Sequence, residues 1–337
     1  MHALVTGGGG FLGRAITEQL LARGDAVTIL SRGRYPEVEA LGARGVQCDL
    51  SAPGDALDSV LSDVDIIFHV ASKTGVWGPR ASFFQANVDG TRNLLEAAQR
   101  AGVRRFVYTS SPSATFDGGD AAGKTEAEAP YPTHFEAPYP ESKAVAEKLV
   151  LDANSADIAT TALRPHLIWG PRDPHILPRL IARHKQGRLM RVGDGTNKVG
   201  ITYIDNAAVA HLQAADVLAF DAPNAGKAYF ITDLEPVLLW PWIDGVLTGV
   251  GLPPIGRSVS AGLAKFVGGV LEWVWRTFRR PGEPPMTRFV AAEMATSHWY
   301  DLTAARTDFG YTPLVGPQEG LDRALAWAKA ELAAGRL

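Results

Sequence analysis

The chain opens with a strand-like apolar run that leads into the glycine-rich stretch Val5-Thr6-Gly7-Gly8-Gly9-Gly10-Phe11-Leu12-Gly13. Gly7, Gly10 and Gly13 have the spacing of a dinucleotide-binding turn, which needs glycine at the bend, beside the pyrophosphate and at the helix–strand contact. The helix that follows would present free N–H groups to phosphates. A glycine-rich surface loop is the alternative. The succession of strand, turn, helix and second strand favours the dinucleotide site, with Phe11 and Leu12 beside the cofactor.

The first half of the chain alternates between strand-like and helix-like segments. We expect strands at 3–6, 26–30, 46–48, 66–70, 106–110 and 159–163. We expect helices between them at 12–23, 56–61, 83–101 and 142–154. Continuous apolar strands separated by helices are typical of a parallel sheet that is covered on both faces. The pattern therefore predicts an α/β fold with a Rossmann-type, doubly wound parallel sheet.

The pattern changes after Pro165, where proline and glycine recur and helical segments dominate. Short strands are expected at 200–204 and 228–232. Six of the eight tryptophans lie in the last third, at Trp240, Trp242, Trp273, Trp275, Trp299 and Trp327. We expect a cofactor-binding domain over 1–165, to which segments of the second half return. Residues 166–337 would form a smaller, mostly helical substrate-binding region.

The composition excludes several classes of function. Lys and Arg total 33 against 36 Asp and Glu, a net charge of −3, and nucleic-acid binding would need a basic surplus or stripe. A single cysteine, Cys48, excludes an intramolecular disulfide framework, and the eight histidines have no metal-ligand spacing, so we expect no metal. Neither a secretion signal nor an uncharged apolar run of membrane-spanning length is apparent. We therefore expect a cytoplasmic protein.

Ser31 and Arg32 follow the second expected strand, where an enzyme that uses NAD usually has an acidic residue. A hydroxyl and a guanidinium suit a 2′-phosphate, which a carboxylate would repel. An ordinary exposed arginine is the alternative. We interpret the pair as favouring NADP(H), with Arg34 as a weaker candidate.

A second motif suggests the chemistry, in the stretch Tyr139-Pro140-Glu141-Ser142-Lys143. Four residues of spacing place Tyr139 and Lys143 on one face of a helix. A phenol has a pKa of about 10, and a nearby ammonium and an oxidised nicotinamide would stabilise its phenolate. The strand at 106–110 ends in hydroxyls at the edge where such sheets bind ligands. We choose Ser111 to orient the substrate oxygen, with Ser110 as the alternative.

These motifs resemble the extended short-chain dehydrogenase/reductase superfamily. The stretches YPESKAVAEK (139–148) and LRPHLIWGP (163–171) resemble its 3β-hydroxysteroid dehydrogenase/isomerase branch. Within that branch, a group of bacterial enzymes, the 2-alkyl-3-oxoalkanoate reductases of olefin biosynthesis, is similar at RGRYP (32–36), LIWGP (167–171), LPRL (177–180) and TSHWY (296–300).

The resemblance implies NADPH-dependent reduction of a 2-alkyl-3-oxoalkanoate, a long-chain β-keto acid, to the 2-alkyl-3-hydroxyalkanoate. Tyr139 would donate the proton, Lys143 would tune Tyr139 and hold the ribose, and Ser111 would orient the oxygen. Further cofactor contacts implied by the superfamily pattern are Asp49, Leu50, Val70, Ala71, Ser72, Asn87, Pro165, Leu167 and Ile168. It also implies a homodimer through the helices at 83–101 and 142–154, and olefin-pathway enzymes as partners.

Three alternatives stay open. A 3β-hydroxysteroid or sterol dehydrogenase that uses NAD(P) belongs to the same branch, although Arg32 argues against an NAD-using steroid oxidase. A sugar-nucleotide epimerase fits the tryptophan-rich last third less well. A cofactor-bound regulator would not need the tyrosine–lysine pair.

Residues 258–280 form an amphipathic pattern. The apolar positions fall on one face, at Leu263, Phe266, Val267, Val270, Leu271, Val274 and Phe278. A core-packed helix, a lid over a hydrophobic substrate and an interfacial anchor are the three interpretations. We expect the lid, with shallow contact to a membrane surface. For the substrate carboxylate, the candidate cations are Lys73, Arg80, Arg172 and Arg179, and the sequence does not choose among them.

Overall fold

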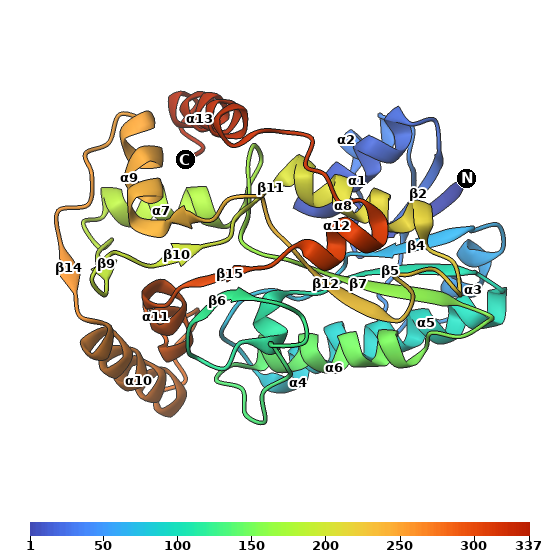
Figure 1. Cartoon of the computed structure of the whole chain (residues 1–337), viewed down its shortest axis with the longest axis horizontal. Coiled ribbons are helices and arrows are strands. Elements are labelled where there is room, and N and C mark those ends of the chain that lie inside the picture. Colours follow the sequence, from blue (N-terminus) through green and yellow to red (C-terminus); the bar gives the residue numbers. More distant parts are fainter.

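A seven-stranded parallel sheet forms the core of the larger half of the molecule in the computed structural model, which describes residues 1–337 (Figure 1). Its order is β12-β7-β5-β4-β1-β2-β3. The strands are β1 (His2–Thr6), β2 (Ala26–Ser31), β3 (Arg44–Gln47), β4 (Ile66–His69), β5 (Arg105–Thr109), β7 (Ala159–Pro165) and β12 (Lys227–Ile231). The chain order reverses between β1 and β4, and this switch point is where doubly wound sheets bind ligands. The predicted Rossmann-type sheet is confirmed.

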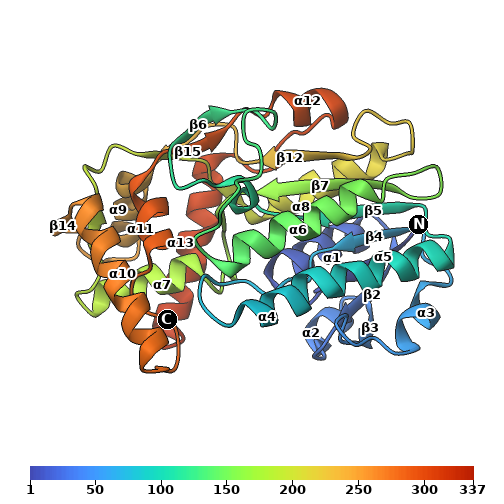
Figure 2. The same ribbon diagram turned by 90° about the horizontal axis from the view of Figure 1, so that it is seen from below.

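Helices cover both faces of this sheet (Figure 2). One face carries α1 (Phe11–Ala22) and α8 (Ile204–Val217), and the other carries α3 (Ala56–Leu61), α5 (Gly90–Ala101) and α6 (Pro138–Asp152). Successive residues of a strand point to opposite faces, so Leu4 and Val5 of β1 enter two separate apolar cores. Burial on both faces explains why the central strands β1, β4 and β5 are mostly apolar.

The smaller half is mostly helical and carries a four-stranded sheet of order β13-β10-β15-β6. Its helices are α7 (Ile176–Lys185), α9 (Leu239–Gly249), α10 (Ala261–Thr277), α11 (Arg288–Ala295) and α13 (Pro317–Ala333). Its strands are β6 (Ala121–Lys124), β9 (Arg191–Val192), β10 (Lys198–Val199), β13 (Val237–Leu238), β14 (Ser258–Val259) and β15 (His298–Tyr300). The elements between the halves or at their edges are α2 (Pro36–Glu39), α4 (Arg80–Phe83), β8 (Ile168–Trp169), β11 (Thr202–Tyr203) and α12 (Thr303–Phe309). No helix combines the length and the apolar character needed to cross a bilayer.

The chain passes between the two halves several times. α8 and β12 return from the second half of the sequence to the parallel sheet, and β6 leaves the first half to pair with β15. The helix expected over 83–101 is interrupted, because α4 continues through a π-helical segment, Phe84–Asp89, into α5. The catalytic helix α6 begins at Pro138, four residues earlier than expected, because prolines in a first turn lack an N–H that would be unpaired there anyway.

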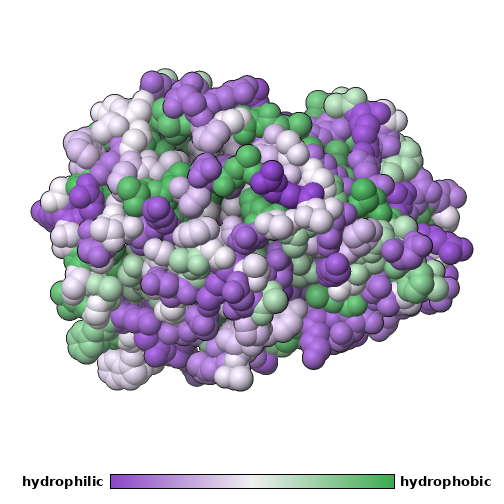
Figure 3. All heavy atoms as spheres, in the orientation of Figure 1, coloured by the Kyte–Doolittle hydropathy of each residue, from purple (hydrophilic) through white to green (hydrophobic).

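The helix expected at 258–280 is present as α10, but its apolar stripe is not buried. α10 packs on α11 through Ala264, Gly268 and Glu272, and a Cβ at Gly268 would lie 2.7 Å from the carbonyl carbon of Thr287. The stripe that we expected to cover a substrate points to solvent instead. Figure 3 shows hydrophobic side chains at the lower left edge of the molecule, where Figure 1 places α10. The helix therefore packs on α11 through its small residues, and its large apolar side chains are left exposed.

A buried ion pair joins the sheet to α6. Arg164 of β7 donates from Nε and Nη2 to the two carboxylate oxygens of Glu147, at 2.9 and 2.6 Å, and Tyr131 donates its hydroxyl to Glu147 at 2.6 Å. Glu147 is 0% and Arg164 5% exposed. Burial alone would raise the pKa of Glu147, but Arg164 holds it below its usual value. The pair therefore stays ionised and fixes α6 against the sheet.

Replacing Glu147 with glutamine should destabilise the protein by about 3 kcal/mol or more, because it leaves the Arg164 guanidinium buried without a counter-charge. Urea unfolding of the variant and the parent measures this difference. Asp58→Asn is the matched control, since it breaks an exposed pair with Arg100 and should leave the midpoint unchanged. Equal stability of Glu147→Gln and the parent would show that the pair does not hold α6.

Candidate functional site

The glycine-rich turn lies between the ends of β1 and β4. Gly7 has φ +68°, a conformation that favours glycine, and a Cβ there would lie 3.0 Å from the Ala71 backbone. A Cβ at Gly13 would lie 2.2 Å from the Gly7 carbonyl oxygen. Gly10 caps α1 without any side-chain hydrogen bond, so the N–H groups that start the helix, at Phe11 and Leu12, are open to a phosphate. The predicted turn is thus assembled as the motif requires.

The end of β2 carries groups that fit an additional phosphate. The Ser31 hydroxyl is buried and has no hydrogen-bond partner. Arg32 is exposed and forms no ion pair, whereas Arg34 is paired with Glu39 at 3.0 Å. Because unpartnered buried hydroxyls are uncommon, the orphaned Ser31 beside a free guanidinium fits the ribose phosphate of a dinucleotide.

The Asp49 carboxylate accepts hydrogen bonds from Ser51, at 2.9 Å from the backbone N–H and 2.7 Å from the hydroxyl. These bonds lower the pKa of Asp49, so it is an anion. Leu50 is buried and supports the start of α5 at Gly90. Sequence reasoning missed Tyr35, whose ring packs over the turn so closely that a Cβ on Gly9 would lie 2.0 Å from its Cγ.

A buried hydrogen-bond relay fixes the loop after β4. The Thr6 hydroxyl accepts from the N–H groups of Val70 and Ala71, both at 3.1 Å, and lies 2.7 Å from Nδ1 of His69. With both acceptor positions filled, Thr6 donates to His69, and His69 Nε2 then donates to Thr91 at 2.8 Å. Burial lowers the pKa of His69 to about 3, so the ring is neutral. The relay positions Val70 and Ala71, with Ser72 next in the loop, beside the glycine turn.

Asn87 connects this loop to the catalytic helix. Its Oδ1 accepts from the Lys73 N–H at 2.6 Å, and its Nδ2 donates to the Lys73 carbonyl at 3.0 Å and to the Ser142 hydroxyl at 2.9 Å. Ser142 in turn donates to the Tyr139 carbonyl at 2.8 Å. Asn87 is 1% exposed, on the π-helical segment that the sequence pattern missed. In this structure Asn87 is therefore a positioning residue for the first turn of α6.

Lys143 lies on α6 behind the carboxyl ends of the strands. Its Nζ donates to the Thr109 carbonyl at 2.5 Å and lies 4.2 Å from the centre of the Tyr108 ring. The side chain is 1% exposed, and burial lowers the pKa of Lys143 to about 7. The ammonium that sequence reasoning treated as permanently charged thus titrates near neutrality.

Tyr139 lies one turn before Lys143 and interacts with Ser111. Burial raises the pKa of Tyr139 to about 12, hydrogen bonding to Ser111 opposes the rise, and the charge of Glu293 adds to it. Burial is the largest cause of the shift, and the phenol is protonated at neutral pH. Stabilisation of the phenolate by Lys143 together with an oxidised nicotinamide stays a prediction. A protonated phenol is the form that donates a proton to a carbonyl oxygen.

The structure brings Ser111 rather than Ser110 to Tyr139. Ser111 follows β5, and its hydroxyl accepts from Ser113, at 3.2 Å from the N–H and 2.9 Å from the hydroxyl. Ser110 is 4% exposed and its N–H donates to the Leu163 carbonyl at 2.6 Å. The geometry supports the choice of Ser111.

Pro165 ends β7, Leu167 lies just before β8 and Ile168 begins β8. Leu167 has φ +42°, a strained backbone for a residue with a side chain, and such strain concentrates at functional sites. Ile168 pairs with Thr202 in the β8–β11 ladder. His166, left outside the predicted site, is buried and hydrogen-bonded to Nδ1 of His298 at 2.6 Å, which makes it a structural link to the smaller half.

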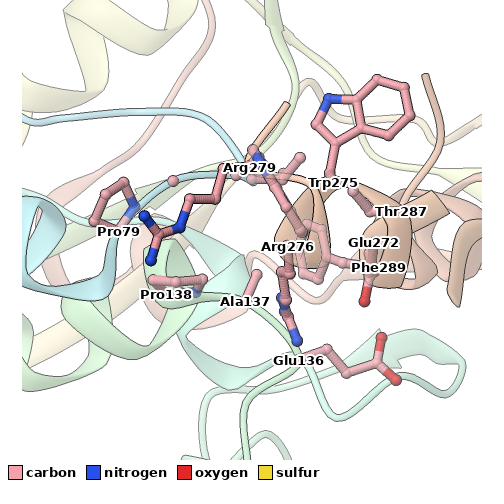
Figure 4. Close-up of a pocket in the computed structure, with 13 residues that line it drawn as sticks. Pro79, Glu136, Ala137, Pro138, Glu272, Trp275, Arg276, Arg279, Thr287 and Phe289 are labelled. Carbon is pink, nitrogen blue, oxygen red and sulfur yellow. The ribbon is translucent and has the colours of Figure 1, made fainter. Parts of the chain in front are cut away.

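A cavity of about 310 Å³ lies beside the start of α6 (Figure 4). It is lined by the loop 76–79, the segment 136–138 and the last turns of α10, with Trp275, Arg276 and Arg279, together with Thr287 and Phe289. Its lining is mixed and includes two arginines and two glutamates.

Most of the predicted carboxylate-binding cations are already paired. Arg80 forms a bidentate ion pair with Glu141, and Arg172 forms one with Glu18. Arg179 pairs with Glu283. Lys73 donates to the Ser82 hydroxyl at 2.7 Å and has no carboxylate partner. Arg276 and Arg279, which no sequence pattern singled out, line the cavity without forming an ion pair.

Glu293 of α11 is a further residue that the sequence did not indicate. Burial raises the pKa of Glu293 to about 7, and its charge acts on both Tyr139 and Tyr300. At neutral pH the Glu293 carboxyl is therefore only partly ionised, which reduces the negative charge that acts on the phenol.

The chain is similar in sequence to a known family and to several known enzymes. A model of the 3-beta hydroxysteroid dehydrogenase/isomerase family matches residues 4–257. Two enzymes named 2-alkyl-3-oxoalkanoate reductase are similar to the chain, both over 96% of its length. The one from Shewanella oneidensis is 47% identical over 85% of its own length. The one from Stenotrophomonas maltophilia is 46% identical over 98% of its own length.

More distant proteins share the fold. The mouse sterol-4-alpha-carboxylate 3-dehydrogenase, decarboxylating, is 33% identical, over 95% of this chain and 88% of its own. Among solved structures, MoeE5 in complex with UDP-glucose and NAD matches with a TM-score of 0.75 and 25% identity, over 98% of this chain and 100% of its own.

The depressed pKa of Lys143 predicts a pH-dependent stability. Between pH 7 and 10.5 the unfolded chain holds a proton on Lys143 that the folded protein has lost, so stability rises with pH across that window. Lys143→Met should remove a slope of at most about 1.4 kcal/mol per pH unit. Urea unfolding of the variant and the parent at the two ends of the window measures it. Parallel pH profiles would contradict the burial of a titrating ammonium.

Proposed function

The chain belongs to the 3-beta hydroxysteroid dehydrogenase/isomerase family, and we propose that it reduces 2-alkyl-3-oxoalkanoates with NADPH. The substrates are β-keto acids with long alkyl chains, and the products are 2-alkyl-3-hydroxyalkanoates. The observation that carries the proposal is the Tyr139 phenol beside Ser111, with Lys143 one helical turn away at the carboxyl edge of the sheet. Identities of 46 and 47% to two reductases of this name, against 33% to the sterol dehydrogenase, support this substrate class.

Tyr139, Ser111 and Lys143 each have a separate role in the proposed reaction. NADPH, when bound, supplies the hydride that the carbonyl carbon accepts. Tyr139, protonated because burial raises its pKa to about 12, donates its proton to the carbonyl oxygen. Ser111 donates a hydrogen bond to the same oxygen and orients it, and Lys143 holds the nicotinamide ribose. One hydride and one proton thus convert the ketone to the alcohol.

The choice of NADPH over NADH rests on the end of β2. The orphaned Ser31 hydroxyl and the unpaired Arg32 guanidinium would hold the 2′-phosphate, and no carboxylate follows the strand to repel it. The remaining contacts would come from the glycine turn, from Asp49 and Leu50, from the loop after β4 and from Pro165, Leu167 and Ile168. NAD is the dinucleotide bound in MoeE5, so a nicotinamide cofactor also agrees with the related fold.

Three further predictions accompany this function. We propose a homodimer through α5 and α6, a cytoplasmic location and association with other enzymes of an olefin pathway. The homodimer rests on the resemblance to the extended short-chain dehydrogenase/reductase superfamily, and the enzyme partners rest on the resemblance to the 2-alkyl-3-oxoalkanoate reductases.

The substrate class is tested by supplying the purified protein with a panel of long-chain β-keto acids and 3β-hydroxysteroids. The β-keto acids are paired with NADPH or NADH, and the steroids with NAD or NADP. We expect oxidation of NADPH by the β-keto acids and negligible reduction of NAD or NADP by the steroids. Steroid oxidation without β-keto acid reduction would instead make the protein a hydroxysteroid or sterol dehydrogenase, the second candidate.

Tyr139→Phe should lower kcat by about 100-fold or more, because no other side chain is placed to protonate the oxygen. NADPH affinity, measured by quenching of tryptophan fluorescence, should stay within a few-fold of the parent. Tyr35→Phe is the matched control, since it removes a phenol beside the glycine turn and should keep kcat. Full turnover in Tyr139→Phe would reject the assignment.

Arg32→Gln should weaken NADPH binding by about 10- to 100-fold, because charge-assisted hydrogen bonds to the 2′-phosphate are lost. NADH binding should be unaffected. The control is Arg34→Gln, whose guanidinium is already paired with Glu39. Equal losses for the two cofactors, or none, would remove the basis for NADP selectivity.

A further inference from the structure

The outward side of α10 carries an unusual concentration of exposed apolar side chains. We define the apolar face of α10 as Leu263, Phe266, Val267, Val270, Trp273 and Phe278, which are 52, 69, 40, 44, 61 and 65% exposed. These six are among fourteen exposed large hydrophobic residues in the whole chain. At about 100° of rotation per residue, the five positions from Leu263 to Trp273 fall on one side of the helix, and Phe278 continues this side at the C-cap. Contiguous exposed apolar surface of this kind indicates an interaction site.

The helix is held so that this face points outward. Glu272, 4% exposed, accepts from the Arg288 N–H at 2.7 Å and from its Nε at 3.1 Å. Gly268 packs directly on the Thr287 backbone, and Ser260 caps the helix by accepting from the Leu263 N–H at 3.3 Å. Turning the helix to bury its apolar face would break the Glu272 contacts and separate α10 from α11. The face is therefore a fixed surface.

Positive charge surrounds the apolar face at its C-terminal end. Residues 261–280 contain four basic side chains and one acidic one, the buried Glu272, in a chain whose net charge is −3. Arg276, Arg279 and Arg280 form no ion pair, and two of them lie over indole rings, at 5.2 Å for Arg276 on Trp77 and 5.3 Å for Arg280 on Trp275. The unpaired guanidiniums of Arg279 and Arg280, just after the helix and next to the exposed Phe278, complement a surface that is apolar in depth and anionic at its boundary.

We propose that the apolar face of α10 docks on an anionic lipid bilayer, with the helix lying in the interface and Arg279 and Arg280, which follow the helix, on the headgroups. An interfacial helix has this combination of an apolar side, aromatic residues and a basic rim. A second copy of the chain is the less favoured occupant, because residues 261–280 offer no exposed acidic side chain to pair with the arginines of the other copy. Docking of this kind needs no membrane-spanning helix.

Docking would bring the C-terminal end of α10 to the lipid surface. Trp275 and Arg276 at this end, and Arg279 just after it, also line the 310 Å³ cavity. A long-chain substrate that partitions into the bilayer would then be concentrated near the element that borders the site. This consequence rests on the proposed function, whereas the docking itself does not.

The test is sedimentation of the full-length protein with vesicles of phosphatidylcholine alone and of phosphatidylcholine mixed equally with phosphatidylglycerol. We expect binding to the mixed vesicles, weakened by salt, and little binding to phosphatidylcholine alone. The double variant Phe266→Ser/Trp273→Ser should lower binding by about tenfold or more. Leu314→Ser is its control, because Leu314 is 61% exposed away from α10.

The charge is tested separately. Arg279→Gln/Arg280→Gln should reduce binding to the mixed vesicles, and Arg44→Gln, an exposed arginine without an ion pair on β3, should not. Unchanged thermal midpoints would show that the variants are folded. The assay contains neither NADPH nor β-keto acid, so its outcome is independent of the proposed reduction.

Several results would overturn the proposal. One is the absence of sedimentation with the mixed vesicles, and another is equal sedimentation with both kinds. A third is concentration-dependent self-association that Phe266→Ser/Trp273→Ser abolishes while vesicle binding is absent, which would assign the face to a second copy of the chain.

Discussion

A buried ammonium group organises the site. Lys143 is 1% exposed, and its Nζ lies 2.5 Å from the Thr109 carbonyl and above the Tyr108 ring. Both partners belong to β5, so these contacts fix the position of α6 relative to that strand. Asn87 and Ser142 fix the first turn of that helix from the side of the β4 loop. Once α6 is fixed, Tyr139 necessarily lies beside Ser111 at the carboxyl edge. Burial of the charge and placement of the phenol are therefore two aspects of one packing arrangement.

The protonation states that result suit reduction. Burial raises the pKa of Tyr139 to about 12 and lowers that of Lys143 to about 7, and Glu293 is raised to about 7 beside them. The site thus carries little fixed charge at neutral pH and holds a phenol ready to donate. Desolvation is the largest cause of the shifts at both Tyr139 and Lys143.

The sheet and the glycine turn were predictable from the sequence because they follow from local rules. Strands buried on both faces are mostly apolar, and the positive φ at Gly7 favours glycine over residues with a side chain. Ser111, Tyr139 and Lys143 were predictable because spacing and strand ends place them together. Arg276, Arg279 and Glu293 were not, since their position depends on how α10 and α11 pack. The helical wheel of α10 identified the apolar face correctly but not its direction, because close packing through Ala264 and Gly268 leaves no periodic signal of its own.

The central claim is that Tyr139 and Ser111 act on one substrate oxygen beside a bound nicotinamide. The most direct measurement is a crystal structure of the protein with NADP⁺ and a 2-alkyl-3-hydroxyalkanoate. The account predicts both hydroxyls within hydrogen-bond distance of the 3-hydroxyl oxygen and Lys143 Nζ on the nicotinamide ribose. A substrate oxygen held by other groups, with the Tyr139 hydroxyl directed away from it, would contradict the account.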